Sequence, residues 1–135
     1  MRKGLVTITK AWVLAITILV VAVTSGALAG AVSDSLWDHV PPRNHIRTNP
    51  LANRPDSVSA GALLYREHCQ QCHMPDAQGD GKKRPPLRSE HIRTASDGDI
   101  EWFLRQGDLR HGMPSWSGLP EAQRWQIVAY LKSLQ

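Results

Sequence analysis

The chain has 135 residues, which is enough for one ordinary domain with an appendage and too few for two full domains. Its formal net charge of +4 is unevenly placed: residues 1–58 carry six Lys/Arg against three acidic residues, while residues 59–135 carry ten against nine. Neither half contains an arginine-rich helix or a ladder of alternating basic and aromatic residues, so we expect no nucleic-acid partner.

An uncharged apolar run occupies residues 11–32, and three basic residues precede it. As a helix these 22 residues would rise about 33 Å, which matches the roughly 30 Å hydrocarbon layer of a bilayer. We therefore expect residues 1–32 to form a single transmembrane helix in the inner membrane, with its N-terminus in the cytoplasm and the rest of the chain in the periplasm. The alternative is a signal peptide cleaved near Ala29, which would leave a soluble periplasmic protein.

Residues 33–57 contain four prolines and three asparagines, and they show neither helical nor strand periodicity. We expect them to form an extended linker that reaches from the membrane to a carboxy-terminal domain of residues 58–135. Trp37 lies in this linker and has two open roles, one at the membrane interface and one against a partner.

The first helix of the domain is expected to begin near Val58, with Asp56 or Ser57 as its cap, and to end at the cysteine pair. Residues 74–92 follow it and are basic and rich in turn-forming residues. They show no periodicity, so we expect something other than regular secondary structure to order them.

Two more helices are expected further along the chain. Ser96 and Asp99 form a capping-box pattern before a helix that stops at Gly107, and a last helix follows Pro120. The apolar stripe of the last helix contains Trp125, Val128, Leu131 and Leu134. No run of residues reads as a strand, and the predicted fold class is therefore all-α.

The only two cysteines of the chain, Cys69 and Cys72, lie three residues apart, and His73 follows directly. A thiol–disulfide motif would stand at the start of a helix in a βαβ pattern, whereas this pair closes a helix and no strand is near. A zinc site would need a fourth ligand, and the spacing of the other histidines fits no compact zinc finger. The remaining chemistry is covalent attachment of haem through both sulfurs, with His73 as the proximal iron ligand.

The sixth position of such an iron has several candidate ligands. Met74 directly follows the proximal histidine, so its side chain cannot reach the opposite face of the ring. Met113 lies in a loop between two helices, where Gly112 lets the backbone come close and Pro114 stiffens the next turn. Met113 is therefore the expected ligand, and His111 is its rival.

From residue 58 to residue 135 the sequence resembles a class I monohaem c-type cytochrome. The likeness rests on the motif at 69–73, on Pro-Pro-Leu at 85–87, on Gly-Met-Pro-Ser-Trp at 112–116 and on the last helix. The resemblance implies a small cytochrome c fold around one haem c that two thioether bonds hold. It also implies that the Pro85 carbonyl binds the proximal imidazole. The residues expected to bind the haem are Cys69, Cys72, His73, Pro85, Leu87 and Met113, of which His73 and Met113 are the iron ligands.

Two further features of the family bear on this sequence. The resemblance implies a close crossing of the first and last helices, with Gly61 and Tyr65 facing Tyr130 and Leu131. The chain departs from the family pattern at Met74, where glycine or alanine is common after the histidine.

The function expected from these features is that of a one-electron carrier in a bacterial respiratory chain, because a six-coordinate iron offers no open site to a substrate. Such a protein is not itself an enzyme. Its expected partners are the membrane and redox proteins, namely a quinol–cytochrome c reductase, a terminal oxidase or a periplasmic dehydrogenase. We expect some of the basic residues between 79 and 93, together with Arg110 beside Met113, to ring the exposed haem edge and to steer docking onto an acidic partner.

Two alternatives to a mobile carrier remain open at this point. One is a fixed cytochrome subunit of a periplasmic dehydrogenase or reductase complex, with the linker as a docking strap. The other is a haem sensor or peroxidase in which the methionine leaves easily.

Overall fold

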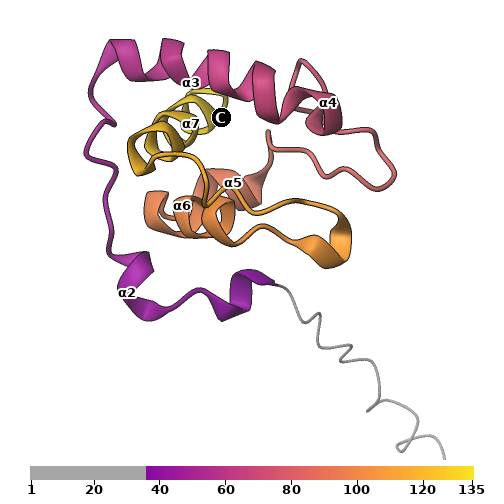
Figure 1. Cartoon of the computed structure of the whole chain (residues 1–135), viewed down its shortest axis with the longest axis horizontal. Helices are drawn as coiled ribbons and strands as arrows, with labels where there is room; N and C mark the ends of the chain where they lie inside the picture. Colours follow the sequence, from indigo (N-terminus) through magenta and orange to yellow (C-terminus); the bar gives the residue numbers. More distant parts are fainter. Residues whose placement is uncertain (1–35) are drawn as a thin grey trace, which may run out of the picture. The chain divides into compact units, whose positions relative to one another are not determined.

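The computed structural model describes residues 36–135, which fold into helices joined by loops (Figure 1). The only strand-like pairing among them is an isolated bridge between Asp108 and Met113. This confirms the predicted all-α class for the described residues. In chain order the helices are η2 (Leu36–His39), α2 (Pro42–His45), α3 (Pro55–His68), α4 (Gln70–His73), α5 (Glu90–Thr94), α6 (Asp97–Gln106), η3 (Leu109–His111) and α7 (Glu121–Ser133).

The membrane anchor expected over residues 1–32 lies outside the described residues. Among residues 36–135, no helix combines the length and the apolar character that crossing a bilayer requires.

Helices α3 and α7 form the centre of the fold and cross each other closely (Figure 1). A Cβ atom on Gly61 would lie 2.0 Å from the carbonyl oxygen of Gln126 and 2.8 Å from the Cβ atom of Tyr130, so only glycine fits at this crossing. The rings of Tyr65 and Tyr130 pack beside it with their centroids 5.3 Å apart. The close helix crossing that the resemblance implied is therefore present. The buried core around it consists of Tyr65, Cys69, Ala77, Ile92, Ile100, Leu104, Trp125, Ile127, Val128 and Leu131.

The boundaries of α6 and α3 follow local sequence signals. The side chain of Ser96 accepts a hydrogen bond from the Asp99 amide, and the Asp99 carboxylate accepts one from the Ser96 amide, each at 3.1 Å. This capping box begins α6, and the helix ends before Gly107, as predicted. Helix α3 instead begins earlier than Val58, at Pro55, because proline lacks an amide proton and has a fixed φ that suits the first helical position.

Helix α5 was not predicted, because its five residues are too few to show a helical period. The Ser89 side chain caps its N-terminus by accepting from the Ile92 amide. At its C-terminal end the Lys132 ammonium donates to the carbonyl oxygens of Ile92 and Arg93, at 3.1 Å and 3.0 Å. The helix is therefore held from α7, about forty residues further along the chain.

The segment predicted as an extended linker, 33–57, differs from that expectation over its described part. Residues 36–54, which we call the amino-terminal strap, contain η2 and α2 and run along α6 before they enter α3 (Figure 1). The Trp37 ring stacks on Phe103 at 4.4 Å between centroids and 12° between planes. Val40 and Asn44 are buried. The two helices of the strap have only four residues each, which is too short for a helical period to be recognised in the sequence.

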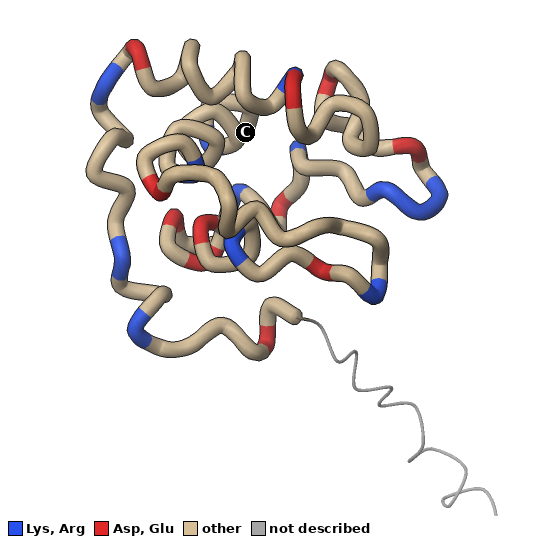
Figure 2. The backbone as a smooth tube through the Cα atoms, viewed as in Figure 1, with Lys and Arg blue, Asp and Glu red and all other residues tan. Residues whose placement is uncertain are grey.

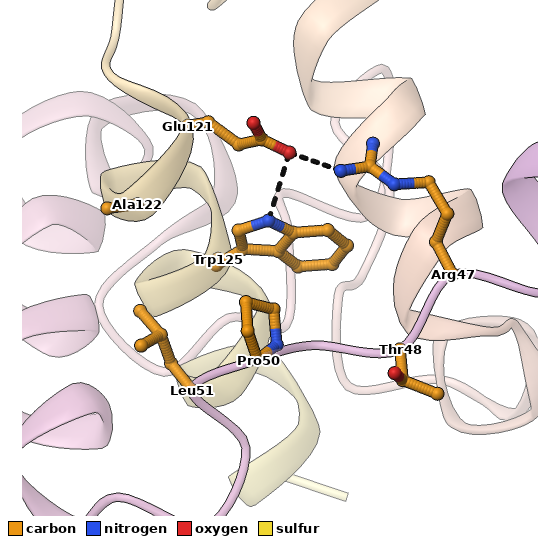
Figure 3. A pocket seen from close by; sticks show the side chains of 7 residues that line it. All are labelled: Arg47, Thr48, Pro50, Leu51, Glu121, Ala122 and Trp125. Atoms are coloured by element: carbon orange, nitrogen blue, oxygen red, sulfur yellow. Dashed lines mark hydrogen bonds and ion pairs between the residues drawn. The ribbon is translucent and has the colours of Figure 1, made fainter.

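Arg47 fastens the strap to helices α6 and α7. Its guanidinium donates at 3.0 Å to Glu101, whose side chain is fully buried, and Arg124 donates to the other oxygen of that carboxylate at 2.8 Å. Arg47 also pairs with Glu121, which accepts a hydrogen bond from the Trp125 indole at 3.2 Å (Figure 3). The hydrogen bond from Arg47 is the main cause that lowers the pKa of Glu121. The strap is thus a bound part of the domain.

Candidate functional site

The two cysteines and the histidine lie on one turn of helix. Cys69 is the residue that directly follows α3, and its carbonyl oxygen accepts hydrogen bonds from the amides of Cys72 and His73, at 3.0 Å and 2.9 Å. Both thiols are free, with Cys69 buried and Cys72 half-buried. His73 is buried beside them. The structure therefore brings all three side chains of the motif together.

The environment of Cys69 argues against a thiol–disulfide site. Burial, with a smaller effect from the neighbouring Cys72, raises the pKa of the Cys69 thiol to about 12. Reactive cysteines have a lowered pKa instead, because the thiolate is the nucleophile. A zinc site has no support either in the part of the chain that the structure describes, where no three His, Cys, Asp or Glu side chains gather to hold a metal ion.

The ring of His73 is held by a backbone carbonyl from the following loop. Its Nδ1 atom lies 3.0 Å from the carbonyl oxygen of Pro85. A carbonyl can only accept, so Nδ1 is the donor in this hydrogen bond, and Nε2 is the ring nitrogen left to bind a metal ion. Leu87 is partly buried against the core, two residues after this proline. The structure thus places Pro85 where the resemblance implied.

Residues 74–89, which we call the basic loop, connect α4 to α5 and are ordered by backbone contacts. Gly79 has a φ of 67°, and a Cβ atom there would lie 2.1 Å from the carbonyl oxygen of Arg84 and 2.9 Å from that of Pro85. Only glycine therefore lets the two arms of the loop approach. One carboxylate oxygen of Asp80 accepts from the amides of Lys82, Lys83 and Arg84, at 2.8–2.9 Å.

The Asp80 carboxylate is correspondingly stabilised in its charged form. Its pKa is lowered, first by the hydrogen bond from the Arg84 amide and then by those from Lys82 and Lys83. Lys82, Lys83 and Arg84 follow Asp80 closely in the sequence, and Figure 2 shows basic residues gathered at this end of the loop. The basic loop thus carries a positive tip on a backbone that one carboxylate holds in shape.

Met113 lies in the loop of residues 107–120, which we call the Met113 loop. Its amide and carbonyl pair with those of Asp108 at 2.9 Å and 2.8 Å. Gly107 has a φ of 70°, and a Cβ atom there would lie 2.5 Å from the carbonyl of Pro114. The Trp116 amide donates to the carbonyl of Leu104 at 2.9 Å and closes the loop onto α6.

Met113 and its rival His111 have different surroundings. The Met113 side chain is partly buried and packs against the core. The His111 side chain is 77% exposed, and its Nδ1 atom lies 2.6 Å from a carboxylate oxygen of Asp108. The position of a Cβ atom on Gly112 lies 3.5 Å from an Arg84 guanidinium nitrogen, so the Met113 loop and the basic loop are neighbours.

Sequence reasoning missed one contact at this site. The Tyr65 hydroxyl donates a hydrogen bond of 2.7 Å to the carbonyl oxygen of Met74, directly after the motif. The sequence has methionine at position 74, where glycine or alanine is common in the family. That difference is the one sequence signal that indicates an unusual backbone position here.

The residues present fit a haem that is bound through two sulfurs. Two free thiols are on one turn, the imidazole beside them keeps one ring nitrogen available, and the thioether of Met113 lies against the same core. Thiol, imidazole and thioether are the groups that hold haem c in proteins.

Comparison with known proteins bears on this fit. No curated protein and no solved structure matches the chain. A family model described as "Cytochrome C oxidase, cbb3-type, subunit III" matches residues 56–131, which is more than half of the chain. Its domain is a class I monohaem c-type cytochrome that carries electrons, so the predicted resemblance is confirmed and the helical fold fits a small cytochrome c. The chain belongs to the family of cbb3-type cytochrome c oxidase subunit III.

Proposed function

We propose that this protein holds one haem c and passes single electrons within a bacterial respiratory chain. Family membership implies haem-based electron transfer. In this chain Cys69 and Cys72 would form the two thioether bonds, and His73 and Met113 would ligate the iron from opposite sides. When bound, the haem supplies a one-electron exchange between ferric and ferrous iron.

The observation that carries this proposal is the hydrogen bond between His73 and Pro85, beside two free thiols. The Pro85 carbonyl fixes the tautomer and the orientation of the ring, and it raises the basicity of the imidazole. A buried imidazole with Nδ1 occupied and Nε2 available is what a proximal ligand needs.

The choice of Met113 over His111 rests on burial and charge. His111 is largely exposed and its ring is engaged by Asp108, whereas Met113 packs against the core. A methionine ligand favours ferrous iron and raises the reduction potential, which suits a position late in a respiratory chain.

The docked strap favours one form of this function. If residues 1–32 are a membrane anchor, only residues 33–35 separate it from the strap, and three residues span at most about 10 Å. A domain so tethered has little freedom to travel between partners. We therefore favour a fixed cytochrome subunit of a membrane-bound respiratory complex over a swinging carrier, with the periplasm as its compartment.

Optical spectra of membrane and soluble fractions test this proposal. We expect a haem c spectrum in the membrane fraction, and we expect the protein that gives it to copurify with a larger complex. A haem c spectrum in the soluble fraction alone would instead support the alternative cleavage near Ala29 and a free carrier. Colourless protein from a host that matures c-type cytochromes would contradict the proposal as a whole.

A further inference from the structure

The backbone directly after the haem-binding motif has a conformation that normally requires glycine. Met74 has a φ of 65° and a ψ of 160°, and side chains other than hydrogen crowd the backbone in this region. Such a conformation persists only where surrounding contacts over-determine it. Contacts around Met74 must therefore hold its backbone in place.

Two hydrogen bonds converge on the carbonyl oxygen of Met74. The Tyr65 hydroxyl donates from α3 at 2.7 Å, and the Ala77 amide donates across the following turn at 3.1 Å. The donors Tyr65 and Ala77 are both buried, whereas Met74 itself is half-buried. Burial, more than nearby charges, raises the pKa of Tyr65, and its hydroxyl keeps the proton that it donates.

Further hydrogen bonds join the turn of residues 74–77 to the segment that contains Pro85, whose carbonyl faces His73. The carbonyl oxygen of Ala77 accepts from the amides of Leu87 and Arg88, at 2.9 Å and 3.2 Å. Pro85 is two residues before Leu87, and its own carbonyl oxygen faces Nδ1 of His73 at 3.0 Å. Together with the chain between them, these hydrogen bonds form a closed ring. It leads from Met74 through Ala77 and Leu87 to Pro85, and from there back to His73.

We propose that Tyr65 is a positioning residue, whose hydroxyl holds Met74 in a glycine-type conformation and thereby sets the place of the Pro85 carbonyl against His73. It is the one side chain that joins helix α3 to this ring of backbone hydrogen bonds among the described residues. The inference rests on the proposed function for its link to the iron, because the hydrogen bond to Nδ1 tunes the basicity of the proximal ligand.

A purely structural role for Tyr65 makes a different prediction. Its ring packs against Tyr130 at the crossing of α3 and α7, and a phenylalanine would fill that space equally well. If packing were its only role, removing the hydroxyl would leave both the histidine and the Met74 turn unchanged.

The test compares holoproteins that carry Tyr65→Phe and, as the matched control, Tyr130→Phe. In the reduced protein, NMR follows hydrogen exchange at Nδ1 of His73 and at the Ala77 amide. We expect Tyr65→Phe to accelerate both exchange rates by roughly fivefold to tenfold, which corresponds to the loss of one hydrogen bond. The reduction potential should also rise, because a less firmly hydrogen-bonded imidazole is a weaker donor to ferric iron. Tyr130→Phe should change neither quantity.

A rescue variant separates the loss of the hydrogen bond from Tyr65 to Met74 from other effects of the substitution. Met74→Gly relieves the backbone strain, so adding it to Tyr65→Phe should return the exchange rates and the potential most of the way to their original values. Unchanged exchange and potential in Tyr65→Phe, or no recovery in the double variant, would overturn the inference. Failure of the proposed function is seen separately, as the absence of a haem c spectrum from the unaltered protein.

Discussion

The Nδ1 atom of His73 lies 3.0 Å from the carbonyl oxygen of Pro85, twelve residues further along the chain. This contact orients the imidazole before any partner is bound, because it fixes both the tautomer and the direction of Nε2. It depends on the shape of the basic loop. Substitutions in this loop should therefore affect the contact with His73.

Gly79→Ala should disturb the basic loop far more than Gly81→Ala. Both glycines have a positive φ, of 67° and 68°, so both substitutions carry a similar backbone cost of about 1–2 kcal/mol. A Cβ atom on Gly79 also collides with the carbonyl oxygen of Arg84 at 2.1 Å, whereas nothing lies within 4 Å at Gly81. Denaturant unfolding should show a clearly larger loss of stability for Gly79→Ala, accompanied by a changed reduction potential. Equal losses for the two variants would show that the close approach at Gly79 does not matter.

Arg47→Met should loosen the strap from the domain. The substitution removes one of two guanidinium partners from the buried Glu101, while Arg124 remains. Because the Arg47 side chain is 37% exposed and solvent screens part of its charge, we expect a loss of about 1–2 kcal/mol in the free energy of unfolding. The matched control is Arg43→Met, at an exposed position of the same strap.

Limited proteolysis gives a second measurement of the same prediction. With Arg47→Met, cleavage within residues 36–54 should become faster before the rest of the domain unfolds. If the strap of this variant resists protease as well as that of Arg43→Met, then Arg47 is not what fastens it.

The positive tip of the basic loop should attract anionic redox reagents. We expect Lys82→Gln with Lys83→Gln to slow oxidation of the reduced protein by ferricyanide about twofold to fivefold at low ionic strength, and salt should abolish the difference. Arg43→Gln with Arg54→Gln removes the same charge from the strap and serves as control. A rate that is independent of ionic strength, or an equal effect of both double variants, would remove the docking role of this loop.

Asp80 should titrate below its usual range in the folded protein. Backbone amides, that of Arg84 above all, hydrogen bond to its carboxylate and lower its pKa relative to the unfolded chain. Since the folded pKa is depressed, the contribution of Asp80 to loop order is present above the unfolded pKa and is lost as pH falls through the folded pKa. Amide shifts of Lys82 and Lys83 in a pH titration should report that midpoint. A midpoint at or above the usual value for aspartate would contradict this assignment.

The elements that the sequence predicted correctly have local causes. Ser96 and Asp99 cap α6 within four residues, and Gly107 ends the same helix. Gly61 was placed at the helix crossing through the family resemblance, and the structure shows why a larger side chain does not fit there. The motif at 69–73 needs only its own spacing to place its side chains on one turn.

The elements that sequence reasoning missed are held by distant contacts. The sequence predicts an extended linker where the strap lies, because the strap shows no helical period of its own and is held by contacts with Glu101 and Trp125, more than fifty residues away. Helix α5 depends in the same way on Lys132. The hydrogen bond from Tyr65 to Met74 cannot be predicted from the sequence, because its acceptor is a backbone carbonyl, a group that every residue carries.

The central claim is that Met113 is the sixth ligand of the haem iron, and one measurement tests it directly. The measurement is the near-infrared sulfur-to-iron band of the oxidised protein, recorded for Met113→Ala and for His111→Ala. We predict that Met113→Ala abolishes the band and lowers the reduction potential, while His111→Ala, at an exposed position in the same loop, leaves both unchanged. A band that persists in Met113→Ala would contradict ligation by Met113.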